Sequence, residues 1–417
     1  MFTGLALRGA GAISSFALAW MLAQMFGARI VGLYQIGFTT ATLFGTVALL
    51  SQDLVLVRQI APLIHEERWA DISARFRGVR RFVTIAGVVL AGACAALAIP
   101  LAQLALDDAA IAPFIIALAP AVLLLALMRV QNALLRCLGS VRLSQSLEGI
   151  SYTTIAMAGL AAVWLLASDP QPLAAPALVI AGLVISVVIG AVYCKQRLAQ
   201  WPGDLAPLPA DARSGAWIAA APILGQAGSW LILLLITGLI DASAGGIFRI
   251  ALLTCMLMQL INTSFATMVG PYLSRAAKAG DQAELRKIVR TAGLIGVALA
   301  APVGIVALML PEWVMGLFGP EFVAGAQALQ LLAVGQLINV LAGPVGVAMI
   351  MLGRERTVLV VECVATLSGL GAALMLLPQW GLAGAGAGLL LADLIRNGAN
   401  WVLVQTASRS LMPIDAD

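Results

Sequence analysis

The chemistry of this chain lies in charged side chains placed inside long apolar stretches. Eight residues are of this kind: Arg8, Asp53, Arg129, Glu148, Arg249, Glu362, Asp393 and Arg396. Inside the hydrocarbon of a membrane each charge costs at least about 2.5 to 3.5 kcal/mol, so it needs a partner, a wet cavity or a route to the interface. An arginine can pair with a carboxylate, and its planar group of donors is equally suited to a phosphate.

Counting residues from the hairpin turns predicts which charges share a depth. Arg129 lies ten residues before Gly139 and Glu148 nine after it, so these two are level and are expected to form a neutralising pair. Arg8 and Asp53 lie within a helical turn of the same depth around the first hairpin. We expect a mainly structural role, so replacing Glu148 alone should harm folding more than replacing Arg129 and Glu148 together.

The last hairpin predicts a second group of charges. Glu362 and Arg396 each lie about seventeen residues from the turn near Gln379. Asp393 precedes Arg396 by three residues, which places both side chains on one face of a helix. These three residues are therefore expected to neutralise one another.

Composition places these charges in a membrane protein. The 417 residues are 61% hydrophobic and only 11% charged, whereas apolar residues usually make up under half of a soluble domain. The sequence predicts an all-α polytopic membrane protein, since runs of about 20 apolar residues can each cross roughly 30 Å of hydrocarbon. We expect about twelve spans, at residues 4–26, 33–57, 82–106, 113–135, 147–167, 174–194, 216–240, 245–269, 289–311, 323–351, 356–377 and 381–405.

The loops predict the orientation of the chain. Arginine and lysine gather in alternate loops, and the remaining loops are acidic or neutral with only Arg29 against them. The positive-inside rule therefore predicts a multi-pass protein of the cytoplasmic (inner) membrane with both termini in the cytoplasm. This bias explains most of the basic excess, so the pI near 9.0 gives no reason to expect nucleic acid as a partner. The five cysteines have no paired spacing, so no disulfide, metal or cofactor is expected.

The sequence also repeats itself after 214 residues. The shift aligns Gly11 with Gly225, Gly32 with Gly246, Tyr34 with Phe248, Gly139 with Gly353, Arg142 with Arg356, and Glu148 with Glu362. We therefore predict two six-helix lobes, 1–200 and 214–417, joined by a cytoplasmic linker at 201–213. Because six is even, both halves enter from the same side, as in transporters whose halves rock around a site between them. Alternating access is the mechanism that this repeat predicts.

Short motifs along essentially the whole chain carry a family resemblance. They are Phe26-Gly27 through Gly32-Leu33-Tyr34, Pro271-Tyr272-Leu273-Ser274 before Gly280-Asp281, Leu317-Phe318-Gly319, Leu352-Gly353-Arg354, and Pro378 with Gly381 to Ala385. In these motifs the chain resembles the polysaccharide-transport branch of the MOP exporter superfamily, which contains the O-antigen and lipid-linked oligosaccharide flippases. It is too short to resemble the fourteen-span lipid II flippases.

The resemblance implies a function that is not enzymatic. It implies that the chain moves a polyprenyl-pyrophosphate-linked oligosaccharide, a precursor in polysaccharide biosynthesis, from the cytoplasmic to the outer leaflet. The partners it implies are the lipid-linked oligosaccharide, membrane lipids, and polysaccharide polymerase or export proteins.

Arg249 is the candidate contact for the substrate pyrophosphate. It lies about one turn inside the eighth span, and the stretch from Leu231 to Ile236 in the neighbouring span offers no carboxylate. Its guanidinium could reach outward to water or lipid phosphate, or face a cavity between the halves and bind pyrophosphate. Arg8 is the candidate for a first contact if Asp53 does not hold it.

Two other functions remain open from the sequence. A cation-coupled multidrug or metabolite antiporter of the same superfamily would need an intramembrane carboxylate, such as Asp53 or Glu362, that stands apart from any arginine. A membrane glycosyltransferase or polymerase would need catalytic groups on outer loops, where Glu312 and Glu321 are the only candidates.

Overall fold

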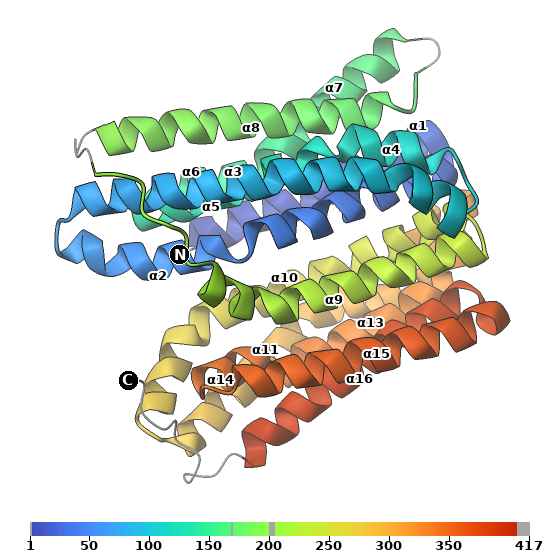
Figure 1. Cartoon of the computed structure of the whole chain (residues 1–417). Coiled ribbons are helices and arrows are strands. Elements are labelled where there is room, and N and C mark those ends of the chain that lie inside the picture. Colours follow the sequence, from blue (N-terminus) through green and yellow to red (C-terminus); the bar gives the residue numbers. More distant parts are fainter. Residues whose placement is uncertain (1, 168–169, 200–204, 407–417) are drawn as a thin grey trace. The chain divides into compact units, whose positions relative to one another are not determined.

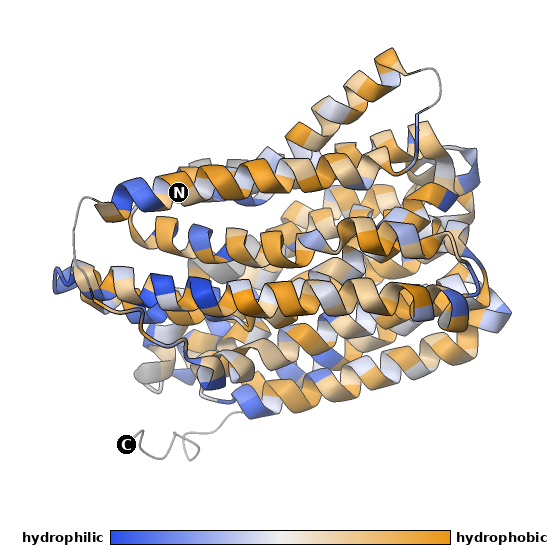
Figure 2. Cartoon of the chain, turned by 45° about the horizontal axis from the view of Figure 1, so that its top comes forward, coloured by the Kyte–Doolittle hydropathy of each residue, from blue (hydrophilic) through white to orange (hydrophobic). Residues whose placement is uncertain are grey.

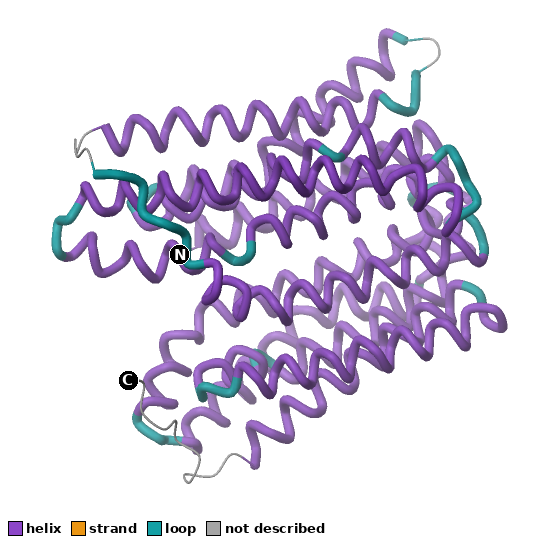
Figure 3. Tube along the Cα trace, viewed as in Figure 1, coloured by secondary structure: helices purple, strands orange, loops and turns teal. Residues whose placement is uncertain are grey.

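A computed structural model describes residues 2–167, 170–199 and 205–406, while the side chains of residues 2–8, 105, 261–268, 271 and 278 lie outside that description. The described residues form helices joined by short loops and contain no strand (Figure 3). The chain divides into two compact units, residues 1–226 and 227–417. The predicted linker at 201–213 stays a prediction, because residues 200–204 are among those not described.

The first unit holds the helices labelled α1 to α8 in Figure 1 and the start of α9. Their bounds are α1 Phe2–Leu49, α2 Gln52–His65, α3 Trp69–Pro100, the π-helix η1 Leu101–Ala105, α4 Ile111–Leu118, α5 Pro120–Cys137, α6 Val141–Gln145, the π-helix η2 Ser146–Ser151, α7 Tyr152–Leu166, α8 Ala174–Ala199 and α9 Ala212–Leu239. Helix α1 contains two spans, because Gly27 adopts φ 74° and ψ 178° and kinks it. Glycine suits this conformation because it lacks a Cβ atom.

The second unit holds the rest of α9 and the helices that follow it. Their bounds are α10 Ala242–Lys278, α11 Gln282–Met309, α12 Pro311–Gly316, the 3-10 helix η3 Pro320–Gly325, α13 Ala326–Ala342, α14 Val345–Met351, α15 Glu355–Trp380 and α16 Leu382–Thr406. Between α13 and α14 the chain breaks at Gly343, with φ 71°, followed by Pro344, which cannot donate a helical hydrogen bond.

The helices agree with the expected number of membrane spans. Ten segments of the described chain are long and apolar enough to cross a membrane, and the first of them, Gly9–His65, contains both spans on either side of Gly27. Helix α16, with 25 residues, is the remaining span of the predicted twelve. Hydrophobic residues predominate along these helices and hydrophilic ones gather at their ends and in the loops (Figure 2).

The two units repeat one packing scheme, as the 214-residue shift predicts. In the first unit α8 packs on α7 and α5, and α5 also packs on α3 and α1. In the second unit α16 packs on α15 and α13, and α13 also packs on α11 and α10. The structure therefore confirms two six-helix lobes of related architecture.

The turns that follow α5 and α14 show the repeat at atomic detail. Gly139 has φ 79° and Gly353 has φ 70°. The next amide donates back to the last helical turn in both places, from Ser140 to the Leu135 carbonyl at 2.8 Å and from Arg354 to the Met349 carbonyl at 3.0 Å. A glycine in the left-handed region with this hydrogen bond is a common way to end a helix, so the aligned Leu-Gly pairs mark equivalent helix ends.

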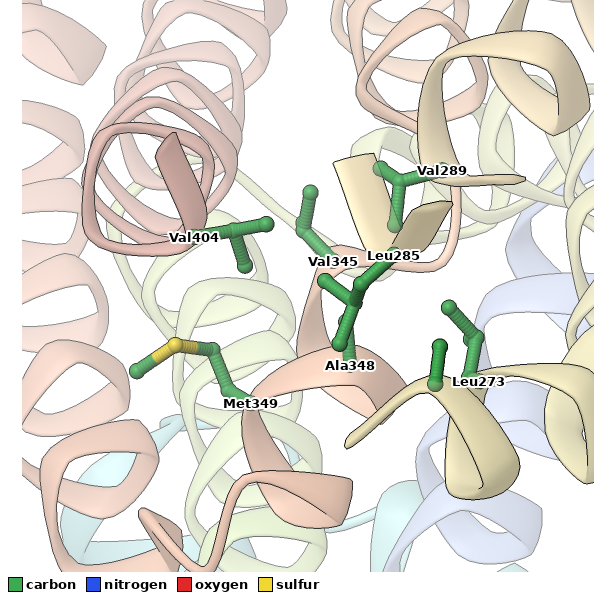
Figure 4. Close-up of a cluster of buried hydrophobic side chains, with 8 residues drawn as sticks. Leu273, Leu285, Val289, Val345, Ala348, Met349 and Val404 are labelled. Carbon is green, nitrogen blue, oxygen red and sulfur yellow. The ribbon is translucent and has the colours of Figure 1, made fainter. Parts of the chain in front are cut away.

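An apolar cluster joins four helices of the second unit. Its buried members are Leu273, Ala276, Leu285, Val289, Val345, Ala348, Met349 and Val404, from α10, α11, α14 and α16 (Figure 4). Gly343 lies against α11, because a Cβ atom there would come within 2.6 Å of the Val289 carbonyl oxygen. The break before α14 thus lets the chain pass close to α11 and bring α14 into this cluster.

Candidate functional site

A buried ion cluster lies between the last two helices of the second unit. Arg396 of α16 donates through Nε to Glu362 Oε2 of α15 at 2.7 Å and through Nη2 to Oε1 at 2.9 Å. Its Nη1 donates to Asp393 Oδ1 at 2.6 Å. The side chains of Glu362, Asp393 and Arg396 are 10%, 15% and 30% exposed. The structure thus brings together Glu362 and Arg396, which the sequence places at one depth, and Asp393, which it places on the same helix face as Arg396.

Neighbouring residues that sequence reasoning missed complete this cluster. A Cβ atom on Gly335 of α13 would lie 2.9 Å from Asp393 Oδ2, so glycine leaves room for the carboxylate. The Thr366 hydroxyl donates to Glu362 Oε1 at 3.4 Å and the Asn397 amide donates to the Asp393 carbonyl oxygen at 2.9 Å. Thr366 and Asn397 each follow a cluster member by four residues, a spacing that could have revealed them.

The predicted pair of Arg129 with Glu148 is wrong. Glu148 Oε2 accepts from Arg136 Nη1 at 3.1 Å, and the two side chains are 41% and 30% exposed. Each Cα–Cβ bond tilts toward the N-terminus of its own helix. Arg136 therefore leans away from the Gly139 turn while Glu148 leans toward it, so they meet. Arg129 leans away from both, and its side chain is exposed.

The remaining candidates lie at separate places. Asp53 is half-buried in the first turn of α2 and makes no ion pair with a residue that the structure describes. The side chain of Arg8 lies outside the described part, so its proposed pairing stays a prediction. Arg249 is half-buried on α10 and interacts with a neighbouring group. Glu312 and Glu321 are both exposed.

Among the described residues, no three histidine, cysteine, aspartate or glutamate side chains are grouped in a way that could hold a metal ion. The described candidate residues instead form groups of opposite charges within apolar helices. In the second unit two carboxylates share one guanidinium. In the first unit one carboxylate pairs with one of two arginines on α5.

Solved structures of transporters share this fold. The eukaryotic MATE transporter AtDTX14 matches with a TM-score of 0.71 at 15% identity, over 97% of this chain and 94% of that one. A mutant of the Vibrio cholerae MATE transporter VcmN matches at 0.67 and 16%, over 98% and 96%. A MOP superfamily transporter from Pyrococcus furiosus, whose binding pocket is described as having reverse polarity, matches at 0.67 and 14%, over 97% and 94%. At these identities the likeness shows the fold alone.

The chain thus has the fold of solved MOP superfamily transporters, and its long apolar helices are those of a multi-pass membrane protein. Residues 61–323, more than half of the chain, match the family described as polysaccharide biosynthesis protein, and the chain belongs to that family. No curated protein sequence matches the chain.

Proposed function

We propose that the chain is a flippase that moves a polyprenyl-pyrophosphate-linked oligosaccharide from the cytoplasmic to the outer leaflet by alternating access. The observation that carries the proposal is the match of residues 61–323 to a polysaccharide biosynthesis family in a chain with a transporter fold. The glycan and pyrophosphate of such a cargo are too polar to cross roughly 30 Å of hydrocarbon unaided, while the polyprenyl tail can stay in lipid.

Intramembrane arginine supports this choice of cargo. In the proposal Arg249 binds the pyrophosphate, because a guanidinium offers two parallel donors to phosphate oxygens. Arg249 is half-buried, and the position that the repeat aligns with it, Gln35, is a buried neutral residue. Arg8 is the proposed first contact near the end of the first span. The second unit thus carries a charge at a place where the first unit carries an amide.

A cation-coupled multidrug antiporter is the second candidate. This candidate depends on Asp53, a half-buried carboxylate whose predicted partner is Arg8. The other carboxylates favour the flippase, since Glu362 and Asp393 are bound by Arg396 and Glu148 is bound by Arg136. A carboxylate that already holds a guanidinium is poorly placed to take up a cationic drug.

The proposed setting is the cytoplasmic membrane with both chain termini in the cytoplasm, as the loop charges predict. The proposed partners are membrane lipids and the polymerase or export proteins that use the delivered oligosaccharide. The solved structures that share its fold are transporters, and the proposed transport by this chain needs no covalent step on the cargo.

The test is transbilayer movement of a fluorescent polyprenyl-pyrophosphate oligosaccharide in proteoliposomes. Native chain, Arg249→Ala and empty vesicles are compared, with Arg142→Ala of α6 as a control for an exposed arginine. We expect movement with the native chain and the control, and its loss in Arg249→Ala. No movement by the native chain, together with uptake of a cationic dye driven by an ion gradient, would contradict the proposal in favour of the antiporter.

A further inference from the structure

Arg129 is exposed in the middle of one of the most covered helices of the first unit. Among the residues of α5, all of which the structure describes, Arg129 is the one exposed residue after Pro120. In the span formed by α4 and α5, 56% of the most apolar 18-residue stretch is buried, whereas in the span of α3 the buried share of such a stretch is 22%. The guanidinium therefore emerges from a packed surface, where Ala126 and Ala133, one turn away on either side, are fully covered.

The depth and direction of Arg129 make lipid an unsuitable surrounding. It lies eight residues before Cys137, which ends α5, and this corresponds to about 12 Å along the helix. Its Cα–Cβ bond tilts toward the N-terminus of α5 and hence away from that nearer end. A guanidinium directed to the middle of the hydrocarbon costs several kcal/mol unless water or an anion surrounds it.

Asn132 and Arg136 extend the same face of α5. They follow Arg129 by three and seven residues, which places all three within about 60° around the helix. Asn132 is fully buried, and neither polar atom of its side chain has a hydrogen-bond partner among the described residues. A buried amide of this kind is normally satisfied by water or by a polar ligand, so this face of α5 requires one of them.

The local charge balance leaves this face positive. Glu148 is bound by Arg136 at 3.1 Å, and the described residues provide no carboxylate within ion-pair distance of Arg129. Two arginines and one carboxylate leave one positive charge, which suits an anion.

We propose that Arg129 lines a water-filled recess in the first unit and binds the pyrophosphate of a lipid-linked cargo, with Asn132 and Arg136 on the same face. This assignment rests on the proposed function and concerns residues of the first unit alone. The recognised chemistry is a polyprenyl-linked phosphate, so an ordinary phospholipid head group is the alternative source that the experiment must separate.

The experiment measures the reactivity of Arg129→Cys in nanodiscs toward a charged, membrane-impermeant thiosulfonate reagent. The half-buried Cys137 and Cys363 are first replaced by serine. Ile85→Cys, at an apolar position of α3 that is 57% exposed, serves as the lipid-facing control. A thiol in contact with water ionises and reacts, whereas a thiol in hydrocarbon stays protonated. Binding of geranyl pyrophosphate is measured separately, as the rise in Tm that it gives to the native chain and to Arg129→Gln in nanodiscs. It is compared with inorganic pyrophosphate and with nanodiscs that contain or lack phosphatidylglycerol.

We expect Arg129→Cys to react, Ile85→Cys not to react, and geranyl pyrophosphate to raise the Tm of the native chain by more than that of Arg129→Gln. An unreactive Arg129→Cys would overturn the recess. An equal rise in Tm for both chains, or a rise given by phosphatidylglycerol alone, would overturn the assignment to the cargo. The assay needs no transport, so its failure is distinct from a failure of the native chain to move the oligosaccharide.

Discussion

Glu148 and Glu362 occupy equivalent places in the two halves of the chain, and the structure gives them opposite surroundings. Glu148 is 41% exposed and binds Arg136 of the preceding span through one oxygen. Glu362 is 10% exposed and binds Arg396 of the following span through both oxygens. The two aligned glutamates therefore differ in their surroundings. Glu148 and Arg136 form a solvent-accessible ion pair, the open pair, whereas Glu362, Asp393 and Arg396 form a buried group, the closed cluster.

The difference follows from the helices that flank each glutamate. Helix α8 carries no charged residue between Ala174 and Cys194, whereas its counterpart α16 carries Asp393 and Arg396 in its middle. The first unit has two arginines on α5 for one carboxylate, and the second has two carboxylates for one arginine. The repeat thus keeps the packing of the helices, while the net charge of the ion group is positive in the first unit and negative in the second.

The largest effect is expected from opening the closed cluster. Arg396→Met leaves Glu362 and Asp393 buried without their counter-charge, which should destabilise the protein by about 3 to 5 kcal/mol. Thermal unfolding and the yield of monodisperse protein in detergent measure this loss. Neutralising all three groups with Glu362→Gln, Asp393→Asn and Arg396→Met should restore most of it. Unchanged stability of Arg396→Met alone would show that the cluster does not hold the fold.

Equal effects in the two units are expected where their packing is equivalent. A Cβ atom on Gly182 of α8 would lie 2.5 Å from the Tyr152 carbonyl oxygen, and one on Gly388 of α16 would lie 2.6 Å from that of Gly369. Each glycine-to-alanine change should cost about 1 to 3 kcal/mol, because the two helices must separate. Gly398→Ala, with no atom within 4 Å of its added Cβ, is the control and should unfold like the native chain. A loss in only one unit would break the structural equivalence.

A smaller effect is expected from the open pair. A double-mutant cycle of Glu148→Gln and Arg136→Gln should give a coupling energy of about 0.2 to 1 kcal/mol, as for other solvent-accessible ion pairs. The cycle of Glu148→Gln with Arg129→Gln should be additive, because these residues do not pair. Unfolding in detergent, monitored for all variants, provides the free energies. Coupling to Arg129 instead of Arg136 would restore the pairing that the sequence suggested.

The smallest effect concerns Asp211, just before α9. Its carboxylate accepts hydrogen bonds from the hydroxyl and the backbone amide of Ser214. These bonds, of which the one from the hydroxyl has the larger effect, lower the pKa of Asp211 from its ordinary value of 3.8. A lowered pKa in the folded state adds stability above the unfolded value near 3.9, and that stability is lost as pH falls through the folded pKa. The difference in Tm between native and Asp211→Asn should therefore be largest near neutral pH and shrink below about pH 4. A difference that grows on acidification would contradict this.

Sequence reasoning reached the spans and the repeat because both leave periodic signals. Hydrophobic runs of sufficient length define the spans, and Gly139 and Gly353 mark equivalent helix ends. It also placed Glu362, Asp393 and Arg396 together, since two of them share a helix face. It misplaced Arg129 because a count from the turn gives depth, whereas contact depends also on direction around and along the helix. Gly335 left no signal, because its role is to provide space for a carboxylate of a distant helix.

The central claim is that Arg129 in the first unit meets the cargo, whereas the cluster of Glu362, Asp393 and Arg396 in the second unit holds the fold. Its most direct test is the transbilayer rate of a polyprenyl-pyrophosphate oligosaccharide in proteoliposomes for two folded variants. One is Arg129→Gln, and the other neutralises Glu362, Asp393 and Arg396 together. We predict that Arg129→Gln loses transport and that the neutralised cluster retains it. Transport retained by Arg129→Gln and lost with the cluster would contradict the account.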